Sequence, residues 1–231
     1  GAFRVTLDDG DEVLGRTVVL ANGVQYRRLP LDRLADFEGR GVYYAATELE
    51  ARFCRGTEAV IVGGGNSAGQ AAMFLSRHAA RTHVVVRGAG LAESMSSYLS
   101  DRIERDDRIT LWTRTQVTSL AGEGRLERVT LTNVDTGEEH AVESRALFIM
   151  IGAAPNTAWL GGQVALDERG FVRTGRDADS DLDGVATSCP GSFAVGDLRA
   201  GSVKRVAAAV GEGSVVISAV HGHLTAAAPA S

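Results

Sequence analysis

Residues 59–69 read Ala-Val-Ile-Val-Gly-Gly-Gly-Asn-Ser-Ala-Gly and carry the strongest indication of the fold class. The four apolar residues at 59–62 predict a short buried strand, and small or apolar residues at helical spacing further on predict a helix. Gly63-x-Gly65-x-x-Ala68 therefore stands between a strand and a helix, as a dinucleotide-binding loop does. Gly63 permits a tight turn, Gly65 lets the backbone approach a pyrophosphate, and Ala68 is small enough for helix-on-strand packing.

The pattern continues downstream of this loop. A second β-branched run lies at 82–86, a helix is predicted from about Ser94 to Arg105, and a third strand follows at 109–112. This βαβαβ order implies a parallel sheet with right-handed crossovers. An antiparallel meander and a final buried strand are predicted next, at residues 117–120, 126–132, 138–142 and 147–151. The sequence therefore predicts an α/β fold with a Rossmann-like domain.

The flanking segments predict further elements. Residues 1–23 alternate around a turn and predict a hairpin that leads into a buried strand, whereas residues 24–56 are rich in loop formers and predict a connection between domains. The C-terminal part predicts a hairpin at 167–174, a strand at 192–195 and a helix from about Val203 to His221.

Composition narrows the class of protein. The 231 residues hold 24 Lys and Arg against 29 Asp and Glu, a net charge of −5, which disfavours nucleic acid as a partner. The longest apolar run, 146–151, is too short for a bilayer, which needs about 20 residues, and the first ten residues lack a signal-peptide pattern. Only Cys54 and Cys189 are present, so we expect a reducing cytoplasm and no disulfide framework.

The end of the second predicted strand indicates which dinucleotide would bind. An NAD site places an acidic residue there, about 20 residues after the glycine loop. This sequence reads Val-Val-Val-Arg-Gly at 84–88, and the next acid is Glu93. Arg87 is a cation placed to meet a 2′-phosphate, so NADPH is favoured over NADH. The alternative is an arginine that is merely solvated at a strand end.

Two other motifs carry little chemistry. Asp179-x-Asp181-x-Asp183-Gly184 matches the first half of a calcium loop, but Pro190 stands where a ligating Glu belongs, so we expect an acidic turn. The histidines of the His-Gly-His run at 221–223 are more typical of a helix end than of a metal site. We therefore expect no metal.

Five blocks of the sequence stand in a fixed order. They are residues 18–23 (Val-Val-Leu-Ala-Asn-Gly), 39–47 (Gly-Arg-Gly-Val-Tyr-Tyr-Ala-Ala-Thr), 60–68, 151–157 (Ile-Gly-x-x-Pro-Asn-Thr) and 187–197 (ending Phe-Ala-Val-Gly-Asp). In this order they resemble the thioredoxin-reductase-like flavoproteins of the pyridine nucleotide–disulfide oxidoreductase class. The resemblance implies an enzyme that passes a hydride from NADPH to FAD and then two electrons to an acceptor, and that acts as a homodimer.

The resemblance also implies which residues hold the cofactors. NADPH would be held by Gly63, Gly65, Asn66, Ser67, Ala68, Arg87 and Gly152. FAD would be held by Gly23, Gly196, Asp197, Lys204, Arg205, Val206 and Ala207. The last four would open a helix whose N-terminus faces the flavin edge that becomes negative on reduction. No catalytic acid or base is expected, because hydride transfer requires only contact between the two cofactors.

Three departures from the family pattern shape the expected chemistry. Where the redox Cys-x-x-Cys should stand, the sequence reads Ala45-Ala46-Thr47-Glu48, so the usual dithiol relay to thioredoxin is not available. The family's His-Arg-Arg run is reduced to Arg-Gly-Ala at 87–89, which weakens the preference for NADPH. The first glycine loop of the FAD domain is missing from the few residues that precede the block at 18–23.

These departures lead to an expected organisation and two functional hypotheses. We expect a partial FAD-domain segment and linker at 1–44, an NAD(P)H-binding domain at 45–158, a C-terminal FAD-domain segment at 159–224 and a disordered tail at 225–231. The first hypothesis is part of a longer flavoprotein whose acceptor is ferredoxin or flavodoxin, oxygen or a quinone, or a partner's disulfide. Alone, this part would hold FAD poorly and be inactive. The alternative is a non-catalytic NAD(P)H-sensing or regulatory module.

Overall fold

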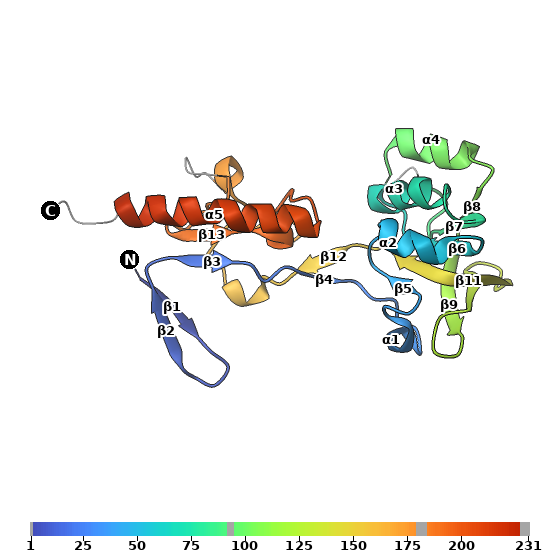
Figure 1. The fold of residues 1–231 in the computed structure, drawn as a ribbon, viewed down its shortest axis with the longest axis horizontal. Helices are drawn as coiled ribbons and strands as arrows, with labels where there is room; N and C mark the ends of the chain where they lie inside the picture. Colours follow the sequence, from blue (N-terminus) through green and yellow to red (C-terminus); the bar gives the residue numbers. More distant parts are fainter. Residues whose placement is uncertain (1, 92–94, 179–183, 227–231) are drawn as a thin grey trace. The chain divides into compact units, whose positions relative to one another are not determined.

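The computed structural model describes residues 2–91, 95–178 and 184–226 (Figure 1). It contains two compact units: unit 1 comprises Gly1–Gln25 and Ala153–Ser231, and unit 2 comprises Tyr26–Gly152. Unit 2 therefore begins earlier in the chain than the coenzyme domain assigned from the sequence, and that assignment remains a proposal. Glu93, the acidic turn at 179–183 and the tail from residue 227 lie outside the described residues.

A seven-stranded mixed sheet forms the centre of unit 2. Its strands in spatial order are β8 (Ile109–Trp112), β7 (Arg81–Val85), β6 (Glu58–Val62), β11 (Glu139–Ile149), β10 (Arg128–Asn133) and β9 (Thr115–Ala121), with β5 (Val42–Tyr43) also pairing to β11. Helices α3 (Asn66–Leu75) and α4 (Ser97–Arg105) connect β6 to β7 and β7 to β8, and these three strands are parallel. The predicted βαβαβ order and meander are confirmed.

Strand β11 joins the parallel and antiparallel parts of the sheet. Its first half pairs antiparallel with β10, and its second half runs parallel to β6 and to β5. Burial follows this change of partners: side chains are exposed at 139–141, alternate between buried and exposed at 142–145 and are all buried from Ala146 to Ile149. Strands buried on both faces carry continuous apolar runs, which explains why the sequence there reads as a buried strand.

The sheet of unit 2 separates two hydrophobic cores. Ala59 and Ile61 of β6 pack with α3 and α4 on one face, whereas Val60 and Val62 pack with the meander on the other. Figure 1 shows α3 and α4 together on one side of the sheet. The alternation follows from the period of two along a strand.

Short elements occupy the segment at 24–56, which the sequence predicts as a loop-rich connection. They are β4 (Val24–Tyr26), α1 (Leu34–Phe37), β5, α2 (Glu48–Ala51) and the 3₁₀ turn η1 (Arg52–Cys54). The prediction did not include these short elements, because tertiary packing holds them: Phe37 and Val42 are each only 1% exposed. Helices of one turn carry too little periodicity to be recognised from sequence.

Unit 1 is built from both ends of the chain. Its elements are β1 (Phe3–Thr6), β2 (Glu12–Gly15), β3 (Val18–Leu20), β12 (Ala153–Pro155), η2 (Ala158–Leu160), η3 (Gly175–Ala178), β13 (Ser192–Ala194), η4 (Gly196–Leu198) and α5 (Val206–Ala226). Strands β1 and β2 form the predicted hairpin, β3 and β13 pair in parallel, and β12 pairs with β4. Val216 and Ala219 of α5 pack against Phe193 of β13.

Three boundaries in unit 1 differ from the predicted ones. Helix α5 begins at Val206 rather than at Val203 and continues to Ala226, so residues 225 and 226, assigned to the tail, are helical. The Thr225 hydroxyl donates to the carbonyl of His221 within the last turns (2.9 Å). The predicted hairpin at 167–174 is a tight turn with a single bridge, Leu166 to Val172.

Among the described residues, no helix is long and apolar enough to cross a membrane.

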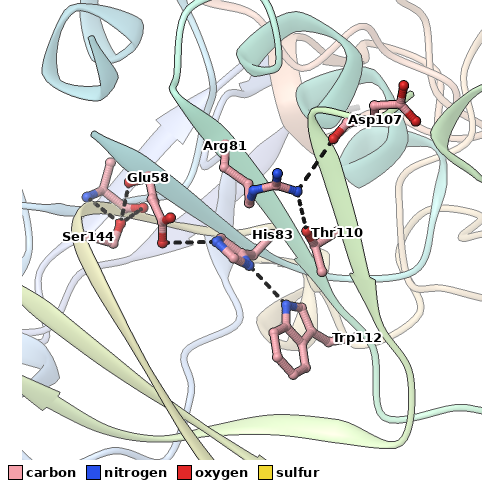
Figure 2. Close-up of polar contacts among 8 residues, drawn as sticks. Glu58, Arg81, His83, Asp107, Thr110, Trp112 and Ser144 are labelled. Carbon is pink, nitrogen blue, oxygen red and sulfur yellow. Dashed lines mark hydrogen bonds and ion pairs between the residues drawn. The ribbon is translucent and has the colours of Figure 1, made fainter. Parts of the chain in front are cut away.

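A polar cluster lies on the meander face of the sheet (Figure 2). The indole N–H of Trp112 donates to Nδ1 of His83 (2.9 Å), so the imidazole proton is on Nε2, which faces Oε2 of Glu58 (3.1 Å). His83 is only 4% exposed, and the ring of His140 lies tilted against that of Trp112, with 4.8 Å between the ring centres. Burial lowers the pKa of His83; the Glu58 carboxylate opposes this shift, and the charges of Arg81 and His140 add to it.

This cluster predicts a pH-dependent stability. The unfolded histidine takes up a proton near pH 6.5, whereas the folded one stays neutral, so the free energy of unfolding falls as the pH drops below about 6.5. The fall continues to the lowered folded-state pKa, with a slope of up to about 1.4 kcal/mol per pH unit. His83→Gln, which can accept from Trp112 without titrating, removes this component. Urea unfolding between about pH 7.5 and about pH 5 measures the free energy of unfolding of the wild type and of the variant. If this free energy changed equally with pH in both, the role of His83 would be contradicted.

Candidate coenzyme-binding site

The turn between β6 and α3 has a backbone that only glycine fits. Gly63 has φ +146°, and its N–H donates to the carbonyl of Val85 on the neighbouring strand (3.1 Å). An added Cβ would lie 2.9 Å from the carbonyl carbon of Met150 and closer still to its oxygen. The turn therefore brings the chain from the sheet to the helix with backbone packed against backbone.

Helix α3 begins without a capping side chain. Gly65 is its N-cap residue, in an extended conformation, and offers no side chain to the N–H groups of the first turn. The carbonyl of Gly65 accepts from the N–H of Gly69 (3.1 Å). N–H groups and a helix dipole of this kind favour an anionic group such as a phosphate.

Small residues let α3 pack closely on its neighbours. Ala68 is fully buried, as the fingerprint requires. Gly69, which sequence reasoning did not assign, has a role of its own, because an added Cβ would lie 2.8 Å from Sδ of Met95 and 3.2 Å from Leu99 of α4. The Ala-Gly pair in the loop sequence was the signal that could have identified it.

Asn66 and Ser67 lie exposed in the first turn of α3. The side-chain oxygen of Asn66 accepts a hydrogen bond from the backbone N–H of Ser96 (2.8 Å), which is the N-cap residue of α4. Asn66 therefore joins the N-termini of the two helices.

Arg87 and Gly152 follow strands that end beside the glycine turn. Val62 and Val85 are paired at the ends of β6 and β7, and exposed Arg87 comes two residues later. Within the described residues, Arg87 forms no ion pair. Gly152 has φ +93° and lies shortly after the end of β11. Met150, the first residue after β11, donates its N–H to the carbonyl of Val62 (2.8 Å). The structure thus brings the glycine turn and both segments to one edge of the sheet.

Unit 1 holds the residues assigned to FAD, in two groups. Gly23 (φ +63°) follows β3, and Gly196 (φ +74°) follows β13, so both stand beyond the same ends of paired strands. Near Gly196, the Lys204 ammonium donates to the carbonyl of Asp197 (3.0 Å) and lies 4.2 Å from the ring centre of Phe171. Burial lowers the pKa of Lys204. Val206 and Ala207 open α5 and are exposed, whereas Lys204 and Arg205 come directly before the helix rather than within it as the sequence predicted.

An ion pair that sequence reasoning missed supports this turn. Oε2 of Glu212 accepts from the N–H of Gly196 (2.6 Å) and from Nε of Arg199 (3.0 Å), and Oε1 accepts from Nη2 of Arg199 (2.6 Å). Arg199 also donates to the hydroxyl of Thr174 (2.7 Å). The bonds from Arg199 hold the pKa of Glu212 below its usual value. The residues are 13 apart on different elements, so no local pattern reveals them.

A helix cap closes the segment at 45–48, where we expect from the sequence that the family's redox dithiol would stand. Ala45 precedes α2, Glu48 is its first residue, and Thr47 forms a capping box with Glu50. Cys54 is fully buried, and burial, with a smaller contribution from Glu50, raises its pKa to about 12. The reactive form of cysteine is the thiolate, so Cys54 is an inert thiol at neutral pH.

Comparison with known proteins agrees with this fold. A family model described as pyridine nucleotide-disulphide oxidoreductase matches residues 1–213, and the chain belongs to this family. Thioredoxin reductase from Bacillus subtilis is 30% identical over 94% of this chain and 66% of that protein. NADPH-dependent thioredoxin reductase 3 from Arabidopsis thaliana is 31% identical over 90% of this chain and 39% of that protein.

A solved structure gives the same result. The crystal structure of thioredoxin reductase from Streptococcus pyogenes matches with a TM-score of 0.80 at 28% identity, covering 95% of this chain and 69% of that one. The resemblance and the α/β fold class expected from the sequence are therefore confirmed. The chain spans 39% and 66% of the length of the two relatives named above.

Proposed function

We propose that this chain provides the NADPH-binding domain and part of the flavin domain of an oxidoreductase that passes a hydride from NADPH to FAD. The glycine turn at Gly63, backed by the carbonyl of Met150 and followed by a helix without a capping side chain, is the observation that carries this proposal. The turn brings the chain directly from the sheet to the start of α3, and a helix N-terminus without a capping side chain stabilises the charge of a pyrophosphate.

Different residues of unit 2 would bind different groups of NADPH. The N–H groups from Gly65 to Ala68 would hold the pyrophosphate, and Arg87 would meet the 2′-phosphate. Asn66, through its bond to Ser96, keeps the two helix N-termini in place. Gly152, with its positive φ and lack of a side chain, would let the coenzyme pass close to the end of β11.

The residues of unit 1 fit the flavin. FAD, when bound, would accept the hydride and could pass on its two electrons together or one at a time. Gly23 and Gly196 leave the strand ends open, Asp197 offers its carboxylate, and Lys204 with the opening of α5 provides positive charge. Positive charge stabilises the anion of the reduced ring.

The electron acceptor differs from the usual thioredoxin relay. The chain holds only two cysteines, Cys54 is buried with a raised pKa, and the dithiol position carries Ala45 and Glu48. We therefore propose an acceptor that takes electrons from flavin directly: ferredoxin or flavodoxin, oxygen or a quinone, or the disulfide of a partner. We expect the complete flavoprotein to be a homodimer.

A second candidate is a non-catalytic module that senses NAD(P)H. The same buried thiol and capped helix favour it, because they leave no group to relay electrons to a disulfide. Adding NADPH to the complete flavoprotein, loaded with flavin, separates the candidates. Rapid bleaching of the oxidised flavin band supports the oxidoreductase, whereas an unchanged band with bound NADPH supports the sensor.

Arg87→Ala tests the coenzyme assignment. Losing a charge-assisted contact with the 2′-phosphate should weaken NADPH binding about tenfold and leave NADH binding unchanged. Calorimetric titration of the wild-type and variant chains measures both affinities. Arg105→Ala, in the last turn of α4, is the matched control. An unchanged ratio of the two affinities in Arg87→Ala would overturn the role of this side chain.

A further inference from the structure

Arg114 has an unusual backbone conformation beside the coenzyme edge. Its φ is +48°, and among the described residues other than glycine only Arg33 also has a positive φ. A left-handed backbone is unfavourable for a residue with a Cβ, and such conformations cluster at functional sites.

Hydrogen bonds connect this turn to the loop that carries Arg87. The N–H of Arg114 donates to the carbonyl of Gly88 (2.9 Å), the residue directly after Arg87. The carbonyl of Arg114 accepts from the N–H of Val134 (2.7 Å), at the end of the β10–β11 hairpin. Because β7 and β8 are parallel neighbours, the two arginines follow adjacent strands at the same edge.

The Arg114 guanidinium is held in a weak ion pair. It donates to Oδ2 of Asp135 at 2.7 Å, and the two side chains are 56% and 51% exposed. Exposed pairs of this kind contribute little and are screened by salt, so a stronger anion can compete for the guanidinium. Asp135 at the same time places a negative charge next to any phosphate bound there.

We propose that Arg114 is a second cation for the 2′-phosphate of the coenzyme and that Asp135 moderates its affinity. This inference rests on the proposed function and deepens it. Arg87 approaches the phosphate from the end of β7, and Arg114 approaches it from the end of β8. The left-handed turn sets the guanidinium beside the adenosine end, and the phosphate takes it from Asp135 on binding.

Replacing Arg114 and replacing Asp135 should change the affinity for a 2′-phosphate in opposite directions. Arg114→Gly keeps the left-handed turn without strain and removes the cation, so the affinity for adenosine 2′,5′-bisphosphate should fall about tenfold. Asp135→Asn removes the competing carboxylate, so the same affinity should rise about threefold. Affinity for 5′-AMP, which lacks the 2′-phosphate, should not change in either variant. Calorimetric titration of the wild-type chain and both variants with each ligand, at low ionic strength, measures these affinities.

Arg33→Gly is the matched control, because Arg33 also has a positive φ and pairs with an aspartate, Asp36 at 3.1 Å. It should leave both affinities unchanged. A purely structural ion pair would make Arg114→Gly and Asp135→Asn act alike, and that result, or no change in either, overturns the proposal. If Arg87→Ala is also without effect and the wild-type chain does not discriminate between the two ligands, the proposed function itself fails.

Discussion

Gly63→Ala is expected to destabilise unit 2 by about 3–5 kcal/mol and to weaken NADPH binding by more than about tenfold. The positive φ strains any residue with a Cβ, and the added carbon meets the backbone carbonyl of Met150, which cannot move without disturbing β11. Urea unfolding gives the free energy, and titration with NADPH gives the affinity.

Gly56→Ala is the matched control for this change. Gly56 also has a positive φ, +68°, but an added Cβ there would have open space around it. Its replacement should therefore cost only the left-handed strain, about 1–2 kcal/mol, and leave NADPH binding unchanged. Equal destabilisation by the two variants would show that the close approach of Gly63 to Met150 contributes nothing.

Glu212→Ala is expected to destabilise unit 1 by about 2–3 kcal/mol. The change leaves the guanidinium of Arg199 and the N–H of Gly196 without their acceptor, and the Arg199 and Glu212 side chains are each only 19% exposed. Chemical unfolding measures the loss. Glu143→Gln, which breaks the exposed pair with Arg128 on the meander, is the control and should change stability by less than about 1 kcal/mol.

The Glu212 pair also gives a signature at low pH. Because its folded-state pKa is lowered, mainly by Arg199, its stabilisation is complete above the unfolded value of 4.5 and is lost as the pH falls through the folded-state pKa. Glu212→Gln keeps an acceptor for Gly196 but does not titrate, so it should remove this component of acid sensitivity. If Glu212→Ala is no more harmful than Glu143→Gln, the pair is not what holds the turn at Gly196.

The sequence predicts unit 2 well because its signals are local. The apolar strand, the glycine turn and the helix follow each other directly at 59–75, and alternation along β9, β10 and β11 marks the meander. The short elements at 24–56 were missed because their stability comes from distant partners. Val42, for example, is placed by its pairing with Leu147.

In the candidate site, too, the sequence predicts the residues with local signals and misses those that depend on distant contacts. Motif spacing identifies Gly63, Gly65 and Ala68, since they stand at fixed offsets between the end of β6 and the start of α3. Contacts between distant segments reveal the others: Gly69 against Met95, Arg199 with Glu212 and Arg114 beside Gly88. The start of α5 was misplaced because residues 203–205 read Val-Lys-Arg, with no helix-breaking residue to separate them from the Ala/Val-rich helix.

A crystal structure of this chain with NADPH tests the central proposal most directly. The predicted result places the pyrophosphate oxygens within hydrogen-bonding distance of the N–H groups in the first turn of α3, next to Gly65, with the 2′-phosphate at Arg87. A coenzyme bound elsewhere, or a protein side chain occupying the first turn of α3 while NADPH is present at saturating concentration, would contradict it.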